Sequence, residues 1–297
     1  MFPARLLWRY RRSSVVGWIA AALIPFAAMM TVEARAAEPA HSRELLYGDG
    51  IAIDVLVDGT GPAVVLLPSS QRDSLDFDEV ARRIACAGYR VLRPQPRGMA
   101  FSRGPLEGLT LSILASDVTL AVDMLGEGRA VIVGHAFGHF IARVMDLEHP
   151  SRVRGVVALG AAARVFPAGL VESLTIAADP GQPREERLKQ LQFSMFAPGN
   201  DASPWLEGWH PELREIYGKA GATPPKDVWW PVSNAPILDL QGAEDPWRPL
   251  DTRNELQDAL GDKVTVRAIP RASHALIPEQ PAAVSEAIVE WIRMLPP

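Results

Sequence analysis

The sequence is short of cysteine. Cys86 is the only cysteine among 297 residues, so no disulfide can form within the chain. A domain of this length relies on its hydrophobic core for stability instead. Cys86 lies in an expected helix over residues 75–87, in which Val80, Ile84 and Ala87 form an apolar face. We therefore expect the Cys86 thiol to be buried and structural rather than reactive.

Basic charge is also scarce. The chain carries 30 Lys and Arg against 35 Asp and Glu, which gives a formal net charge of −5. Removal of residues 1–36 would take away five Arg and one Glu and leave a net charge of −9. A nucleic-acid-binding protein needs a basic face, so this balance argues against a nucleic-acid partner. The partner that we expect is a small-molecule substrate or ligand.

The N-terminal segment is typical of an export signal. Four arginines lie within residues 5–12, an apolar stretch covers residues 15–30, and Ala34-Arg35-Ala36 is a small-x-small cleavage site. The apolar stretch contains Pro25 and is shorter than the ~20 residues that a membrane-spanning helix needs. We predict a signal peptide over residues 1–36 and a periplasmic or secreted product without a membrane anchor. An adjacent arginine pair leaves twin-arginine export open beside the Sec route that we favour.

The most informative absence is at residue 136. An apolar run over residues 130–133 leads into Gly134-His-Ala136-Phe-Gly138, and a helical pattern follows. A strand, a tight turn flanked by glycines and a helix form the layout of a nucleophile elbow, which lifts one side chain out of a strand end. That side chain is expected to be Ser, Cys or Asp, whereas Ala136 offers only a methyl group. The sequence therefore predicts the turn without its usual attacking atom.

Two later strand-like runs end beside groups that could complete a catalytic site. Residues 235–242 lead into Asp245, and residues 264–270 lead into His274. The chain order of nucleophile position, acid and base is that of the α/β-hydrolase fold. Over roughly residues 44–295 the chain thus resembles the α/β-hydrolase superfamily. The resemblance rests on three motifs, namely Gly134–Gly138, Gly242–Asp245, and Ser273-His274 before a final amphipathic helix.

Strand and helix patterns alternate along most of the chain, which predicts a mostly parallel sheet with helices on both faces. We expect one α/β domain over residues 37–297, with a core of about 44–161 and 232–297. Residues 162–231 break the alternation and sit where the superfamily inserts a helical cap. Further expected strands are 45–47, 51–57, 63–67, 89–92 and 153–159, and expected helices are 111–125, the elbow helix to about 148, 184–196 and 212–220.

The loops that follow the last two expected strands contain the candidate catalytic acid and base. His274 lies between a late strand and the last helix, so it is the candidate general base. Asp245 would hold the imidazole tautomer and stabilise its charged form, although an Asp before Pro246 is also common turn chemistry. Glu244 is the neighbouring alternative acid.

The resemblance also implies an oxyanion hole made of two backbone N–H groups. Phe137, which follows the elbow residue, would supply the first. The second would come from the loop after residues 63–67, where many relatives carry His-Gly and this chain has Ser69 and Ser70. We choose Ser70 as the donor, and Ser69 becomes a candidate replacement nucleophile or a group that orients a water. A polar loop with local hydrogen bonds is the plainer interpretation.

His135 and His139 flank the elbow, and a histidine pair near an Asp raises the question of a metal. The Gly134–Gly138 turn holds these two side chains apart, and no third ligand has metal-site spacing. We predict no metal and no cofactor. Four tryptophans in the expected cap, which are Trp205, Trp209, Trp229 and Trp230, predict a binding site for a small apolar or aromatic ligand, unless they are simply core.

Three functional hypotheses follow from these residues. The first is an enzyme in which an Asp245–His274 dyad activates water or deprotonates a small, apolar, ester-like or carbonyl substrate without an acyl-enzyme. The second is a catalytically inactive ligand-binding protein that kept the pocket. The third is a serine hydrolase in which a serine was replaced by alanine to trap a complex. Retention of both Asp245 and His274 favours the enzyme.

Overall fold

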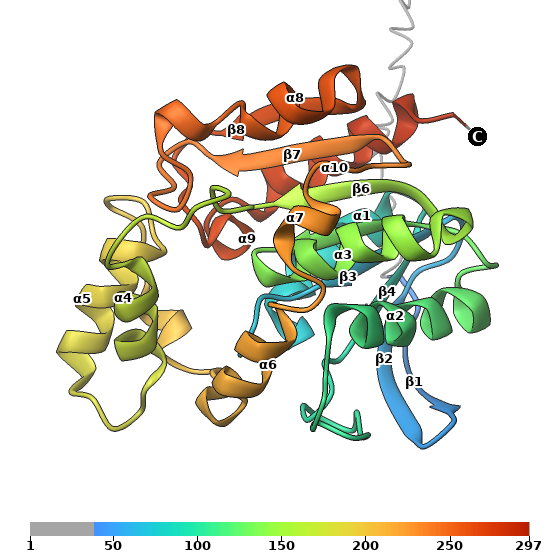
Figure 1. The fold of residues 1–297 in the computed structure, drawn as a ribbon, viewed down its shortest axis with the longest axis horizontal. Helices are drawn as coiled ribbons and strands as arrows, with labels where there is room; N and C mark the ends of the chain where they lie inside the picture. Colours follow the sequence, from blue (N-terminus) through green and yellow to red (C-terminus); the bar gives the residue numbers. More distant parts are fainter. Residues whose placement is uncertain (1–38, 297) are drawn as a thin grey trace, which may run out of the picture. The chain divides into compact units, whose positions relative to one another are not determined.

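The computed structural model describes residues 39–296, so the predicted signal peptide over residues 1–36 lies wholly outside the described residues. Within that range the chain forms a sheet with the strand order β1-β2-β4-β3-β5-β6-β7-β8 (Figure 1). The first two pairings in this order are antiparallel, and all the others are parallel. The strands are β1 (His41–Gly48), β2 (Ile51–Asp58), β3 (Ala63–Leu67), β4 (Arg90–Pro94), β5 (Ala130–His135), β6 (Val153–Leu159), β7 (Ile237–Gly242) and β8 (Val264–Ile269).

The central strands are buried on both faces. Every residue of β3, β5 and β7 is buried, as a continuous apolar run predicts for a parallel strand between two helical layers. One layer contains α2 (Leu111–Leu125) and α3 (Phe137–Glu148), and the other contains α1 (Asp78–Cys86) and α10 (Pro281–Met294). Two separate hydrophobic clusters, one under each layer, form the core. This is the mostly parallel, doubly covered sheet that the sequence predicts.

Short helices lie between β6 and β7 in sequence; α4 and α5 lie beyond the edge at which those strands end, whereas α7 lies beside α3 (Figure 1). The sequence predicted helical patterns for α5 and α6 but not for α4 or α7. Leu191, Phe196 and Trp205 belong to a small hydrophobic cluster of this segment that also includes Ala275 of the core. The helices are α4 (Leu170–Ala178), α5 (Arg184–Ser194), α6 (Arg214–Ala220) and α7 (Lys226–Trp229).

Cys86 is exposed at the end of α1, so the expectation of a buried thiol is wrong. The helix packs through Val80 and Ile84, which are fully buried. Each helical residue turns the side chain by about 100°, so a residue two positions after Ile84 faces away from the core. In the part of the chain that the structure describes, no helix has the length and apolar character to span a membrane.

Candidate active site

The turn between β5 and α3 has the backbone of a nucleophile elbow. Ala136 adopts φ 45° and ψ −111°, a combination that a residue with a Cβ rarely takes. The two flanking glycines make the turn possible. A Cβ on Gly134 would lie 2.3 Å from the carbonyl carbon of Gly138, and one on Gly138 would lie 2.4 Å from the carbonyl oxygen of Leu67. The strained backbone of a nucleophile elbow is therefore present, although the side chain at its centre is only the methyl group of Ala136.

The structure brings Asp245 and His274 together. Asp245 follows β7 and His274 follows β8, and these neighbouring parallel strands end at the same edge of the sheet. The Nδ1 atom of His274 lies 2.9 Å from Oδ2 of Asp245, and both side chains are buried. Glu244, the alternative acid, is exposed to solvent. With Nδ1 donating to the carboxylate, Nε2 of the neutral imidazole keeps a lone pair that can accept a proton.

Trp247 completes the surroundings of this dyad, and the sequence reasoning missed it. Its backbone N–H donates to Oδ1 of Asp245 at 2.8 Å, so both carboxylate oxygens are bonded. Its indole ring stacks on the imidazole of His274 with ring centroids 5.1 Å apart. The indole Nε1 donates to the carbonyl oxygen of Ser194 at the end of α5. Its position two residues after Asp245 was the only available signal.

The two histidines of the elbow have different environments. Nε2 of His135 donates to the carbonyl oxygen of His274 at 2.8 Å, which ties the elbow to the His274 loop. Burial lowers the pKa of His135 to about 3, so this side chain stays neutral. His139 donates from Nδ1 to the carbonyl oxygen of Ala136 at 2.5 Å, and its buried Nε2 has no partner within the described residues. Burial also lowers the pKa of His139 well below 6.5.

The expected oxyanion residues meet at the same place. Phe137 is the first residue of α3, where a backbone N–H has no acceptor within its own helix. Ser69 and Ser70 follow β3, and both line the same pocket as Phe137 and His274. Among residues 39–296, no hydrogen bond joins Ser69 to His274, so the structure lacks the direct contact by which a base activates a serine.

The tryptophans expected to contact a ligand have other roles. Arg72, in the loop after β3, lies between the rings of Trp205 and Trp209, with its guanidinium carbon 4.4 and 4.8 Å from the two centroids. These two rings therefore hold the loop that carries Ser69 and Ser70. The Trp229 and Trp230 side chains are buried, and their carbonyl oxygens accept hydrogen bonds from Arg143. This placement corrects the expectation, because none of the four lines the pocket described next.

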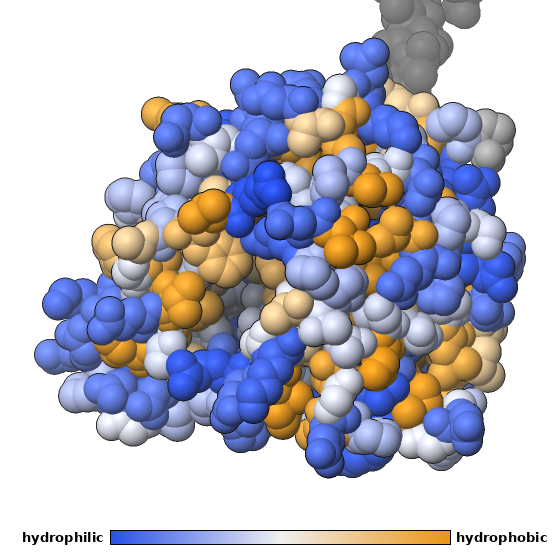
Figure 2. Space-filling model, in the orientation of Figure 1, coloured by the Kyte–Doolittle hydropathy of each residue, from blue (hydrophilic) through white to orange (hydrophobic). Residues whose placement is uncertain are grey.

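A pocket of about 400 Å³ opens over the elbow and the dyad. Figure 2 shows a hollow on this face, between the region of α4 and that of α6 and α7, with hydrophobic residues around it. Ala136 and His274 both line the pocket. Its aromatic walls are Phe137, Phe140, Phe166, Tyr217 and Trp247. An apolar or aromatic ligand remains the expectation, although different side chains provide the surface.

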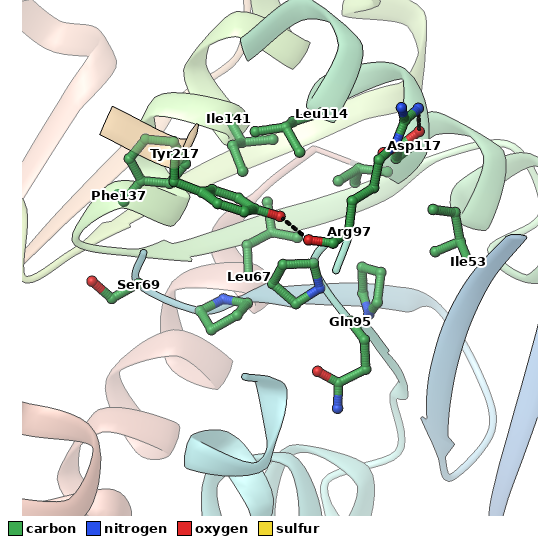
Figure 3. Close-up of a pocket in the computed structure, with 14 residues that line it drawn as sticks. Ile53, Leu67, Ser69, Gln95, Arg97, Leu114, Asp117, Phe137, Ile141 and Tyr217 are labelled. Atoms are coloured by element: carbon green, nitrogen blue, oxygen red, sulfur yellow. Dashed lines mark hydrogen bonds and ion pairs between the residues drawn. The ribbon is translucent and has the colours of Figure 1, made fainter. Parts of the chain in front are cut away.

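A second cavity of about 30 Å³ shares Ser69, Phe137 and Tyr217 with the larger pocket (Figure 3). Its volume is enough for about one or two water molecules. The Tyr217 hydroxyl donates to the carbonyl oxygen of Arg97 at 2.9 Å, and burial raises the pKa of this phenol, so it remains a donor. The Arg97 guanidinium turns away and pairs with Asp117. In Figure 3 the Ser69 hydroxyl points away from this small cavity.

Several curated relatives of the chain are described as hydrolases. An epoxide hydrolase from Caballeronia sordidicola is 28% identical over 214 residues, which cover 71% of this chain and 57% of that protein. Bifunctional epoxide hydrolase 2 from Sus scrofa is 31% identical over 117 residues, which cover 39% of this chain and 21% of that protein. Zearalenone hydrolase from Bionectria ochroleuca is 28% identical over 204 residues, which cover 65% of this chain and 72% of that protein. The chain therefore spans less than two thirds of the length of both epoxide hydrolases.

Solved structures share the fold. A thermophilic esterase from Thermogutta terrifontis superposes with a TM-score of 0.69 at 22% identity, covering 85% of this chain and 98% of that one. An esterase from Exiguobacterium antarcticum superposes with a TM-score of 0.69 at 21% identity, covering 85% of this chain and 100% of that one. A family model described as alpha/beta hydrolase fold matches residues 62–229, which is more than half of the chain. The relatives support a hydrolase, and the chain belongs to the alpha/beta hydrolase fold family.

Proposed function

We propose that this hydrolase cleaves a small ester-like or carbonyl substrate by direct attack of water, without an acyl-enzyme. The observation that carries the proposal is the assembled Asp245–His274 hydrogen bond of 2.9 Å beside an elbow that presents only the methyl group of Ala136. A methyl group occupies less space than the usual nucleophile, and in this proposal the attacking water takes up the space between the elbow and the imidazole. In this proposal His274 is the general base, the backbone N–H groups of Phe137 and Ser70 are the oxyanion donors, and water supplies the missing nucleophile.

Water and the side chains already named account for every bond and proton in the proposed hydrolysis. Nε2 of His274 removes a proton from water while the resulting hydroxide oxygen bonds to the carbonyl carbon. The negative charge that develops on the carbonyl oxygen is stabilised by the backbone N–H groups of Phe137 and Ser70. Collapse of the tetrahedral intermediate breaks the bond to the leaving group, which takes the proton from His274. Asp245 orients the imidazole and stabilises its transient positive charge.

The test begins with a panel of ester, lactone and thioester substrates and two histidine variants. His274→Ala should abolish the activity, because it removes the base. His149→Ala, a half-buried histidine at the other end of α3, should leave it unchanged. Loss of activity in both variants, or in neither, would contradict the proposal and place the reaction elsewhere.

A phosphonate probe for active serines tests the missing nucleophile. The protein should resist the probe, whereas Ala136→Ser should be labelled at residue 136, because the elbow and the base are already assembled. Labelling of the unchanged protein at Ser69 would establish a relocated nucleophile and refute direct water attack.

The inactive binding protein is the alternative, and the absence of a nucleophilic side chain at Ala136 is the observation that favours it. It predicts no turnover across the panel, together with a higher melting temperature in the presence of a small apolar ligand.

A further inference from the structure

The charges that line the pocket over the dyad are all positive. Lys226 of α7 and Arg214 of α6 line it, and its lining within the described residues contains no Asp or Glu. Asp245 stands behind His274 and is not part of the lining. This is unexpected in a chain with a formal net charge of −5. A half-buried concave surface with charges of one sign concentrates ligands of the opposite sign.

Lys226 forms no direct ion pair with a carboxylate in the described part of the chain, although the charge of Glu255 acts on it at longer range. Among residues 39–296, no Asp or Glu oxygen forms an ion pair with its Nζ atom. The ammonium donates one hydrogen bond, of 3.0 Å, to the carbonyl oxygen of Arg164, and it has three N–H groups to donate. Its other neighbours are three aromatic rings, with Nζ 5.0, 4.5 and 5.5 Å from the centroids of Phe140, Phe166 and Trp230.

The ammonium of Lys226 has N–H groups left to donate toward the open pocket. Burial lowers the pKa of Lys226 to about 8, which means that the surroundings disfavour the charged form. A lysine with only a structural role is usually paired or solvated at its charged end. An anionic group entering the pocket would supply the missing partner and would restore the charged form.

The rings beside Lys226 continue to the dyad. Phe166 contacts Lys226 and also lies 5.7 Å from Trp247, and Trp247 stacks on His274. An unbroken aromatic wall thus connects the ammonium with the imidazole. A ligand that places its charge at one end and its reacting bond at the other would cover this wall with an apolar body.

From this arrangement we propose that Lys226 is an anion-binding residue and that the natural ligand carries a carboxylate at the end of an apolar body. For an enzyme, this assigns the substrate class and rests on the proposed function, with the scissile bond at His274 and the carboxylate at Lys226. Arg214, which is exposed and donates to Thr175 at 3.0 Å, attracts the same charge from the rim.

The test measures binding and needs no turnover. Calorimetric titrations would compare phenylacetate and 3-phenylpropionate with their neutral amides, which have the same shape. We expect the carboxylates to bind more tightly than the amides. Lys226→Met keeps an apolar stem but removes the charge, so it should weaken carboxylate binding by about 10- to 100-fold, the range for a charge-assisted hydrogen bond, and leave amide binding unchanged. Lys226→Arg should retain most of the preference.

Lys219→Met is the matched control, because Lys219 is an exposed lysine of α6 that pairs with Glu215 and does not line the pocket. It should bind both ligands as the unchanged protein does. The proposal is overturned if carboxylates and amides bind alike, if neither binds, or if Lys226→Met weakens both equally. Repeating the titrations with His274→Ala separates the two proposals: a retained carboxylate preference supports the Lys226 site even if no substrate of the panel is turned over.

Discussion

Trp247 touches both members of the dyad: its backbone N–H is bonded to Asp245, and its ring stacks on His274 at a centroid distance of 5.1 Å. Trp247→Phe keeps a ring over the imidazole but loses the hydrogen bond to Ser194, whereas Trp247→Ala leaves a void. We expect a lower kcat in both, a larger drop in Trp247→Ala, and a loss of about 3–5 kcal/mol of unfolding free energy in Trp247→Ala. Steady-state kinetics and urea unfolding would check this. An unchanged kcat in Trp247→Ala would remove the ring from the catalytic geometry.

The elbow residue itself is open to a second test. Ala136→Gly relieves a backbone strain of roughly 1–3 kcal/mol, against about 0.5–1 kcal/mol for the greater freedom of glycine in the unfolded chain. Stability should therefore stay level or rise. Activity should largely remain, because the methyl group takes no chemical part in water attack. Thermal unfolding and the substrate panel measure both effects, and a large loss of activity would show that the methyl group positions the water or the substrate.

Gly138 should tolerate no side chain. A Cβ at this position would lie 2.4 Å from the backbone oxygen of Leu67, so Gly138→Ala must displace the helix from the sheet and should destabilise the fold by at least about 1–3 kcal/mol. Gly218→Ala is the control, since it lies within α6 with nothing within 4 Å of its Cβ. That change should be neutral or stabilise by about 1 kcal/mol. Equal unfolding midpoints for the two variants would contradict the close packing of the elbow.

Carboxylate binding should depend on pH through Lys226. Burial lowers the pKa of this lysine to about 8, so it is an ammonium below that pH and an amine above it. Phenylacetate affinity should accordingly fall as the pH rises through 8, by up to tenfold per unit. Among the charged and titratable groups acting on Lys226, Glu255 raises its pKa and Arg164 lowers it, and His139 is already neutral in this range. A flat profile between pH 7 and 9 in calorimetry would exclude Lys226 as the titrating anion site.

If the protein is exported, we expect residues 1–36 to be removed from the mature chain. Protein recovered from its native host should begin at Ala37 and be found in the periplasm or the medium, because the residues up to Ala36 have the charge, length and cleavage site of a signal peptide. Intact-mass and N-terminal measurements would decide this. A membrane fraction that retains Met1 would show an anchor instead.

The sequence alone predicted the features that depend on local pattern and on chain order. The glycines around Ala136 predicted the elbow because only glycine permits such a close backbone approach. The meeting of Asp245 and His274 was also predictable, since each follows a strand, and neighbouring parallel strands of a sheet end at one edge.

The tertiary structure decided which side chains occupy the space above that edge. Arg72 lies between Trp205 and Trp209, although more than a hundred residues separate them, and no periodicity indicates such a contact. Lys226 and Trp247 also line the pocket, and the local sequence around each of them gives no sign that it lies near Asp245 and His274. Most of the stability of short helices such as those between β6 and β7 comes from tertiary packing, so the packing against the core decides which of their residues line the pocket.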